Sequence, residues 1–161
     1  MARLITPDNL GAWLLRCNPA QEPELPRLVA GGGHRIKRWC VADNYRSQLM
    51  TAGDRVVFWV SGDGRQLTRG IWGVGEVLRV NGFRKPTGPD QSDDRAPVGP
   101  AGRPEVEVDI PLLTEALSDS LLRAAGIGDL EVQVQPQGAN PSWVSTEQLA
   151  RLATVGPGLF D

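Results

Sequence analysis

The longest apolar run in the chain, Val56–Val60, has only five residues, and glycine-rich turn residues follow it directly. A helix that crosses a membrane needs roughly 18 consecutive apolar residues, so we expect no transmembrane segment. The first residues also lack the apolar core of a signal peptide, which predicts a cytoplasmic protein. A run this short is typical of a buried strand. We therefore expect a core that is built from short elements.

Length and composition indicate an ordinary globular domain. A chain of 161 residues favours a single domain over residues 1–161. Its content of 40% hydrophobic and 22% charged residues is close to the average of such domains. The formal net charge is −2, so the protein has no overall positive field that would attract nucleic acid or membranes. Any contact with nucleic acid must come from a local patch or a pocket.

The residues that perform most acid–base and metal chemistry are scarce. Cys17, Cys40 and His34 are the only cysteines and the only histidine, whereas a structural zinc site needs about four such ligands in a cluster. We expect two reduced, buried thiols and an exposed histidine that follows three glycines in a loop. The common nucleophile-elbow, phosphate-loop and zinc-protease motifs are absent from the sequence. The sequence thus predicts no catalytic residue, no metal and no cofactor.

Strands dominate the predicted secondary structure. Segments with an apolar run or with alternating apolar and polar residues are typical of strands, and Gly53-Asp54 predicts a turn into one of them. The predicted strands are Trp13–Leu15, Arg55–Ser61, Gly70–Val80, Val106–Ile110 and Leu130–Val134.

The predicted helices are short and lie between or after the strands. They cover Glu24–Ala30, Ser118–Ala125 and Thr146–Ala153. Gly126 ends the second helix, and Ser145 with Gln148 forms a capping box at the start of the third. Residues 81–104 are rich in proline and glycine, and we expect a mobile surface loop there. An α+β or all-β fold follows, for which a small curved barrel with peripheral helices fits best.

Aromatic residues are unusual in kind and in position, because the chain has five tryptophans but a single tyrosine. Trp39, Trp59 and Trp72 fall close together in the sequence, next to the basic stretch 34–46. Alternation predicts that Trp72 shares a strand face with Val74, opposite Val77. Each of these tryptophans could be a core residue. Together with nearby polar groups they also suggest an aromatic slot for a nucleobase, which stacks on indole for roughly 1–3 kcal/mol.

The motifs in this region resemble, in their order along the chain, those of the EVE domain family. That family belongs to the PUA-like superfamily and is related to the YTH domains, which bind methylated adenine in RNA. The resemblance covers about residues 12–80 by motif and extends to the C-terminus by element order. The matching motifs are Trp39-x4-Asn44-Tyr45, Gly53-Asp54, Val57-Phe58-Trp59-x-Ser61 and Gly70-Ile71-x-Gly73-x2-Glu76-Val77.

The resemblance implies a fold and a function. The fold is a PUA-like β-pseudobarrel of five or six strands with short peripheral helices. The function is that of a non-catalytic module that reads a modified, in particular a methylated, nucleobase. Its partner would be DNA or RNA, with the base in a single strand or flipped out of a duplex. Some prokaryotic relatives belong to modification-dependent restriction systems, so a partner nuclease is a further expectation.

The resemblance also assigns roles to residues of the slot. Trp39 and Trp59 would be the stacking walls, and Trp72 would be either a wall or a core residue. Tyr45 would line the slot or anchor the loop beneath it. Hydrogen bonds to the base edge would come from Asn44, Ser61 and the Cys40 backbone. Phosphate contacts would come from Arg35, Lys37, Arg38 and Arg46, although a solvated charged loop is the simpler interpretation of these four cations.

Two other function classes are compatible with the same residues. The aromatic slot could accept a peptide or a side chain of a partner protein. An enzyme that acts on a nucleotide would need His34 or the Cys40 thiol as its reactive group.

Overall fold

The computed structural model describes residues 5–19, 25–31, 34–42, 45–62, 65, 67–81, 105–135 and 141–160. Within these ranges the chain forms six strands and five short helices. Nearly all of the loop predicted at 81–104, and Asn44 of the predicted slot, lie outside the described residues. No helix in the described ranges is both long enough and apolar enough to cross a membrane.

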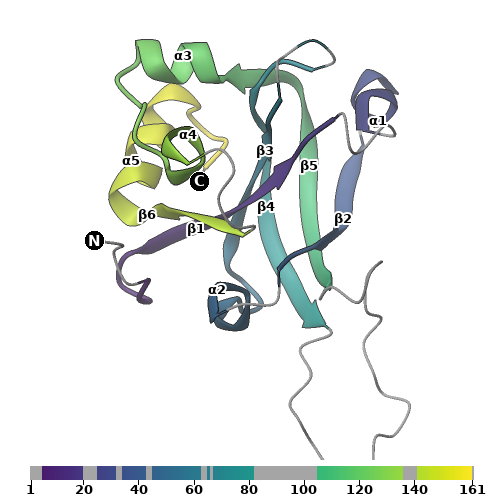
Figure 1. Ribbon diagram of the computed structural model, residues 1–161, viewed down its shortest axis with the longest axis vertical. Coiled ribbons are helices and arrows are strands. Elements are labelled where there is room, and N and C mark those ends of the chain that lie inside the picture. Colours follow the sequence, from purple (N-terminus) through teal and green to yellow (C-terminus); the bar gives the residue numbers. More distant parts are fainter. Residues whose placement is uncertain are drawn as a thin grey trace, which may run out of the picture.

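All six strands join one mixed sheet that curls without closing (Figure 1). Its order is β2-β5-β4-β3-β1-β6, so β2 and β6 are the two edges. β1 and β3 are parallel, and the other neighbours are antiparallel. The architecture confirms the predicted α+β pseudobarrel. The strands are β1 (Leu10–Cys17), β2 (Arg35–Cys40), β3 (Arg55–Val60), β4 (Gly70–Asn81), β5 (Glu105–Ser118) and β6 (Ser142–Ser145).

The inner side of the curled sheet holds one hydrophobic cluster. In β3, Val56, Phe58 and Val60 point to this side, because alternate residues of a strand share a face. Helix α1 (Leu25–Gly31) adds the buried Leu25 to the same cluster. We call this cluster the inner core.

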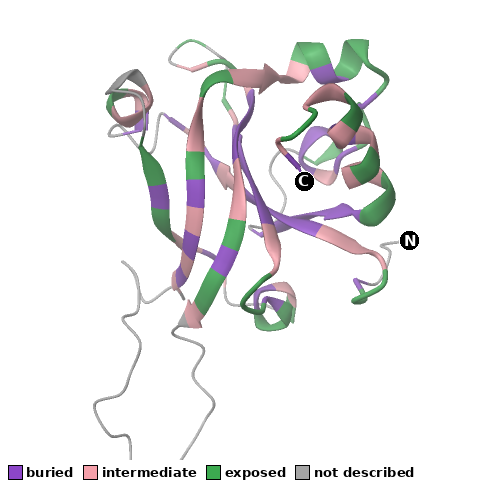
Figure 2. Cartoon of the chain, turned by 180° about the vertical axis from the view of Figure 1, so that it is seen from behind, coloured by how far each residue is buried: buried purple, intermediate pink, exposed green. Residues whose placement is uncertain are grey.

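The outer side of the sheet holds a second cluster under a layer of helices. Val57 and Trp59 of β3 face this side. Helices α3 (Asp119–Ala124), α4 (Glu131–Val134) and α5 (Thr146–Val155) lie together against it, as Figure 1 shows. Beyond the helices, β2, β4 and β5 leave exposed residues on this outer face (Figure 2).

Most predicted elements are confirmed, although β5 continues from the predicted Val106–Ile110 to Ser118 and β1 is longer at both ends than the predicted Trp13–Leu15. Helix α5 begins with the predicted capping box, in which the Ser145 side chain accepts the Gln148 N–H and the Gln148 side chain accepts the Ser145 N–H. Gly126 follows α3 with a positive φ of 84°, a conformation that favours glycine.

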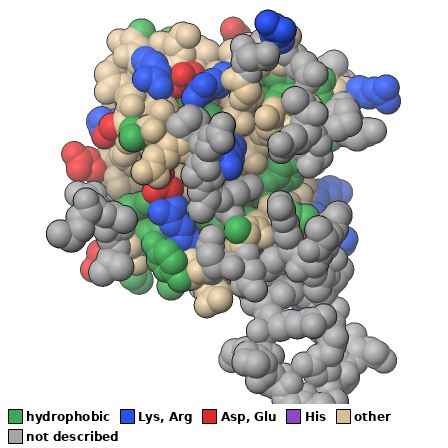
Figure 3. Space-filling view, in the orientation of Figure 1, with side chains coloured by type: hydrophobic (Ala, Val, Ile, Leu, Met, Phe, Trp, Pro, Cys, Tyr) green, Lys and Arg blue, Asp and Glu red, His purple; other side chains and the backbone are tan. Residues whose placement is uncertain are grey.

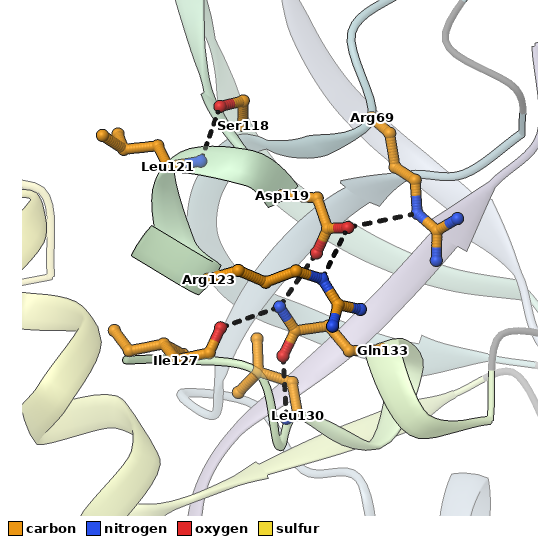
Figure 4. Close-up of polar contacts among 8 residues, drawn as sticks. All are labelled: Arg69, Ser118, Asp119, Leu121, Arg123, Ile127, Leu130 and Gln133. Carbon is orange, nitrogen blue, oxygen red and sulfur yellow. Dashed lines mark hydrogen bonds and ion pairs between the residues drawn. The ribbon is translucent and has the colours of Figure 1, made fainter. Parts of the chain in front are cut away.

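The strand predicted at Leu130–Val134 is wrong, because these residues form the start and body of α4. The buried polar side chain of Gln133 explains the difference (Figure 4). Its Oε1 accepts the Leu130 N–H at 2.9 Å, and its Nε2 donates to the Ile127 carbonyl and to Asp119, each at 2.9 Å. These bonds tie the turn before α4 to α3. An alternation of apolar and polar residues over only five positions cannot distinguish a strand from a short helix of this kind.

Candidate functional site

Burial separates the five tryptophans, all of which lie in the described ranges. Trp13 and Trp59 have no exposed surface, and Trp72 and Trp143 are 6% and 8% exposed. Trp39 is half-buried and packs against the edge of the inner core. It is therefore the one indole of the chain that keeps a substantial surface for a ligand.

The Trp39 ring is held by a second aromatic residue. Trp39 lies on the edge strand β2, opposite Val106 of β5. Its ring meets Phe58 of β3 edge to face, with the centroids 5.0 Å apart and the planes at 84°. Such a contact fixes the orientation of the indole. The side-chain entropy of Trp39 is therefore lost when the chain folds and not when a ligand binds. The site thus contains a partly exposed and pre-oriented aromatic surface.

The predicted pair of walls, Trp39 and Trp59, is wrong. Trp59 belongs to the outer cluster, whereas Trp39 packs against the inner core. Alternation along β3 places Phe58 on the inner side and Trp59 on the outer side. Phe58 is the aromatic partner that sequence reasoning missed, although the alternation of Val56, Phe58 and Val60 could have indicated it.

Trp72 is a core residue, and its predicted strand face is also wrong. A β-bulge displaces it, since Trp59 pairs with Ile71 and Phe58 pairs with Gly73, which leaves Trp72 as the extra residue. Trp72 therefore shares the inner core with Val77. Its Nε1 donates to the Thr68 carbonyl at 2.7 Å, so the indole N–H is already satisfied.

The described polar residues of the predicted slot come from three different elements or their ends. At the ends of β1 and β3, both the N–H and the Oγ of Ser61 donate to the Cys17 carbonyl, at 2.7 and 3.1 Å. Tyr45, at the start of α2 (Tyr45–Leu49), is 52% exposed. Cys17 is buried, as expected, whereas Cys40, next to Trp39 on β2, is only half-buried.

Three of the four predicted phosphate contacts are exposed on β2. Nη1 of Arg35 donates to both carboxylate oxygens of Asp109, at 2.6 and 2.9 Å. Arg38 lies 3.8 Å from Glu105 in a loose ion pair, and its side chain is largely exposed. Lys37 is exposed as well. Arg38 and Lys37 are therefore the cations on this strand that a ligand can reach most easily.

The fourth predicted phosphate contact, Arg46, is wrong. Its guanidinium forms a two-pronged ion pair with Glu131 of α4, in which Nη1 meets Oε1 and Nη2 lies 3.0 Å from Oε2. The two side chains are only 14% and 22% exposed. The hydrogen bond that Arg46 donates to Glu131 is the main cause that raises the pKa of Arg46, against a smaller opposing effect of burial. A phosphate would have to displace a carboxylate that already occupies this fork.

A shallow depression of about 390 Å³ lies on the outer face, away from Trp39. Its charged lining comes from neighbouring strands, and the Arg35–Asp109 ion pair spans part of it. His34 is exposed, and its backbone carbonyl accepts the Leu112 N–H at 2.9 Å. Among the described residues, no three His, Cys, Asp or Glu side chains are grouped so that they could hold a metal ion.

Comparison with solved structures identifies the same fold elsewhere. A protein from Pseudomonas syringae matches with a TM-score of 0.56 and 21% identity over 89% of this chain and 98% of that chain. A Pseudomonas putida protein matches with a TM-score of 0.56 and 22% identity, over 89% of this chain and 98% of that chain. A hypothetical protein from Leishmania major matches with a TM-score of 0.57 and 18% identity, over 91% of this chain and 94% of that chain. Neither the protein-family models nor the curated proteins give a match. At these identities the likeness establishes the fold alone.

Proposed function

We propose that the chain is a non-catalytic module that reads a modified nucleobase in DNA or RNA, with Trp39 as the surface on which the base stacks. One observation carries this proposal. Four of the five indoles are buried, whereas Trp39 is half-buried and held in place by Phe58. A rigid, partly exposed indole is what a stacked base requires.

The energetics of such a site suit a reader of methyl groups. Stacking of one base on an aromatic side chain contributes roughly 1–3 kcal/mol and is tolerant of sequence. A methyl group that leaves water for an apolar surface adds about 0.8 kcal/mol. Hydrogen bonds to the base edge must supply the remaining selectivity, since a wrong base would leave a polar group unpaired. Asn44, the Cys40 backbone and Ser61 remain our candidates for these bonds.

The surroundings of Trp39 fit a strand of nucleic acid in which one base is bound. Lys37 and Arg38 precede Trp39 on β2 and are exposed, so they are available for contacts with phosphates of the same strand. The motif that joins Trp39 to Asn44-Tyr45 is also part of the resemblance to EVE domains. The proposed partner is a single strand or a flipped base in cytoplasmic nucleic acid, with a nuclease as a second partner that would act on the marked strand.

The test is a titration of short single-stranded DNA and RNA followed by fluorescence anisotropy. Each oligonucleotide carries one central N6-methyladenine, 5-methylcytosine or unmodified base. We expect tighter binding of one modified strand, and Trp39→Ala should weaken it about 5- to 150-fold, which corresponds to the loss of one stacking contact. Trp39→Phe should retain much of the affinity.

Leu121→Ala is the matched control, because Leu121 is an exposed apolar residue of α3 outside the site, 46% exposed. It should leave binding unchanged. A folded Trp39→Ala protein with the affinity of the wild type would overturn the proposal.

A protein-binding module is the second candidate, and one surface favours it. Tyr45 and Leu49 are four residues apart on α2, so they lie on one helix face, and they are 52% and 46% exposed. Figure 3 shows exposed hydrophobic side chains in the region of α2. If no oligonucleotide bound in the titration, this surface would become the leading candidate site.

A further inference from the structure

Arg69 is a cation that the fold neutralises only weakly. It lies directly before Gly70, the first residue of β4, and its side chain is 32% exposed. Its ion pair with Asp119 is loose, because the Arg69 Nε and the Asp119 Oδ2 are 3.9 Å apart, beyond hydrogen-bond distance. The same Nε has no hydrogen-bond partner among the residues that the structure describes. The Arg69 guanidinium therefore still lacks a close anion.

Asp119 is occupied mainly by other donors. Its Oδ2 accepts the Arg123 Nε–H at 3.1 Å, and its Oδ1 accepts a Gln133 Nε2–H at 2.9 Å (Figure 4). Two arginines thus share a single carboxylate. We call Arg69, Asp119, Arg123 and Gln133 the Asp119 cluster. Its two cations and one anion leave a positive charge in excess.

The guanidinium groups of Arg69 and Arg123 are neighbours. Each Nε lies within 4 Å of the same oxygen, Asp119 Oδ2. In Figure 4 the ends of both side chains lie beyond this carboxylate, and no oxygen of the residues drawn lies between them. The Arg123 side chain is 48% exposed, so both groups can be reached from solvent. An arginine presents five N–H donors in a planar fork, and this shape matches the oxygens of a phosphate.

The backbone holds the two arginines in place before any ligand binds. The Asp119 N–H donates to the Arg69 carbonyl at 2.8 Å, which joins α3 to the chain before β4. A Cβ on Gly70 would lie 2.3 Å from the Leu117 carbonyl oxygen, so the two segments are in close contact. Arg123 follows Asp119 by one helical turn on α3. A site whose parts are fixed by the fold loses less entropy when a ligand binds.

The Asp119 cluster is remote from Trp39. Trp39 pairs with Val106 near the start of β5, whereas Gly70 pairs with Ser118 at its end. Figure 1 shows the start of β5 and α3, which follows its end, at opposite ends of the sheet. A strand segment of this length measures about 40 Å at full extension. A group held at the cluster is therefore distinct from a base that is stacked on Trp39.

We propose that Arg69 and Arg123 form a second binding site, which takes a phosphate group. The excess positive charge of the cluster matches the single negative charge of a phosphate in a nucleic-acid backbone. Charge-assisted hydrogen bonds from two arginine forks are among the strongest contacts that a phosphate makes in proteins. The phosphate belongs either to a long bound strand or to a free small molecule. The site does not rest on the proposed function.

The test is a titration with inorganic phosphate at constant ionic strength, with chloride as the balancing anion. The NMR signals of the Arg69 and Arg123 Nε–H groups report binding, and we expect them to shift until the site is saturated. Arg69→Gln should weaken phosphate binding about 10-fold, the value of one charge-assisted hydrogen bond. Arg69→Lys, which keeps the charge but not the fork, should retain part of the affinity. Acetate should bind more weakly than phosphate.

Asp119→Asn separates a phosphate site from a purely structural cluster. If the arginines serve only to anchor α3, phosphate binds to neither the wild type nor this variant. In a phosphate site Asp119 is a competing anion, so Asp119→Asn should tighten phosphate binding about fivefold, the effect of one charge at 4 Å in water. The Trp72 Nε1–H donates to the Thr68 carbonyl next to Arg69, so an unchanged Trp72 signal shows that each variant keeps the local fold.

Arg151→Gln is the matched control. The Arg151 Nη2 lies 2.8 Å from Asp129 in a one-to-one ion pair, and its Nε also lacks a hydrogen-bond partner in the described part of the chain. The two arginines thus differ in that Arg151 has a close carboxylate of its own. Arg151→Gln should leave phosphate binding unchanged.

Oligonucleotides of two lengths identify the source of the phosphate. If it belongs to a bound strand, Arg69→Gln should weaken only the oligonucleotides that are long enough to reach from Trp39 to the Asp119 cluster. If it belongs to a free small molecule, Arg69→Gln should leave both lengths unchanged, and inorganic phosphate should still bind to the wild type. Either result supports the site.

The outcomes separate this site from the proposed function. The phosphate site is refuted by the absence of a saturable shift with phosphate, by an equal affinity of Arg69→Gln, or by acetate that binds as tightly as phosphate. None of these results affects the role of Trp39. A wild type that binds no oligonucleotide would refute the proposed function, and the phosphate titration would still decide whether Arg69 and Arg123 form a site.

Discussion

Two fully buried indoles differ in what their N–H groups meet. The Trp13 Nε1 donates to Asp54 Oδ2 at 2.9 Å, and Asp54 also accepts the Thr51 N–H at 2.9 Å. The Trp59 Nε1 has no hydrogen-bond partner among the residues that the structure describes. A buried donor without a partner costs about 1–3 kcal/mol. The same ring is thus more favourable at position 13 than at position 59.

This difference predicts the order of two matched substitutions. Trp13→Phe removes ring volume and a hydrogen bond, whereas Trp59→Phe removes similar volume and an unpaired donor. We expect Trp13→Phe to lower the free energy of unfolding by about 1–3 kcal/mol more than Trp59→Phe does. Urea unfolding followed by far-ultraviolet circular dichroism measures both. Equal losses would contradict the assignment of an unpaired N–H to Trp59.

Sequence alone singled out Trp39 as a candidate site residue but not the residues that it contacts. Trp39 is recognisable from its motif, and its exposure is consistent with the predicted role. The phase of β3 decides that Phe58 rather than Trp59 meets it, and a bulge decides the side on which Trp72 lies. Arg46 meets a carboxylate 85 positions away, which no local pattern indicates. For Arg46 and for the bulge at Trp72 the missing information was long-range pairing, whereas the phase of β3 follows from its local alternation.

At the scale of elements, glycines on β4 allow β5 to approach closely. A Cβ on Gly75 would lie 1.8 Å from the Asp109 carbonyl oxygen, and one on Gly73 would lie 2.9 Å from the Pro111 carbonyl oxygen. No side-chain rotation relieves a contact with backbone. Gly126, after α3, is different, because a Cβ there would meet nothing within 4 Å and the cost is only its φ of 84°.

We therefore expect Gly75→Ala to be far more destabilising than Gly126→Ala. Gly126→Ala should cost about 1 kcal/mol, through backbone strain alone. Gly75→Ala must separate β4 from β5, so a loss of about 3 kcal/mol or more is expected. Thermal unfolding of the two variants gives the comparison. Similar melting temperatures would show that β4 and β5 can adjust to a side chain at position 75.

The elements that sequence predicted well carry their own local signals. The hairpin strands β3 and β4 have glycine turns and apolar runs, and α5 has its capping box. Helices α2 and α4 have one turn each and depend on contacts from other elements, such as Gln133 with Asp119. Strand β6 has four residues, all buried, and shows no alternation. Segments of this kind have structure only in the assembled fold.

At the scale of the whole molecule, 17 basic residues are nearly matched by 19 acidic residues, which gives a formal net charge of −2. The same balance holds among the four cations that the sequence predicts as phosphate contacts. Arg35 is paired with Asp109 and Arg46 with Glu131, which leaves Lys37 and the loosely paired Arg38 as the reachable cations of the predicted four. A bound strand would therefore release few counterions.

This charge balance predicts a shallow salt dependence for the oligonucleotide that binds most tightly. One or two phosphate contacts to a single strand give a slope of log affinity against log salt of about −0.7 to −1.4. Lys37→Ala should reduce the magnitude of that slope by the amount that one phosphate contact contributes, and it should not change the preference for the modified base. Arg35→Ala is the control and should change neither quantity, because its guanidinium is already bound by Asp109. A slope steeper than about −3 would mean that phosphates outside the described site dominate binding, and that stacking on Trp39 is secondary.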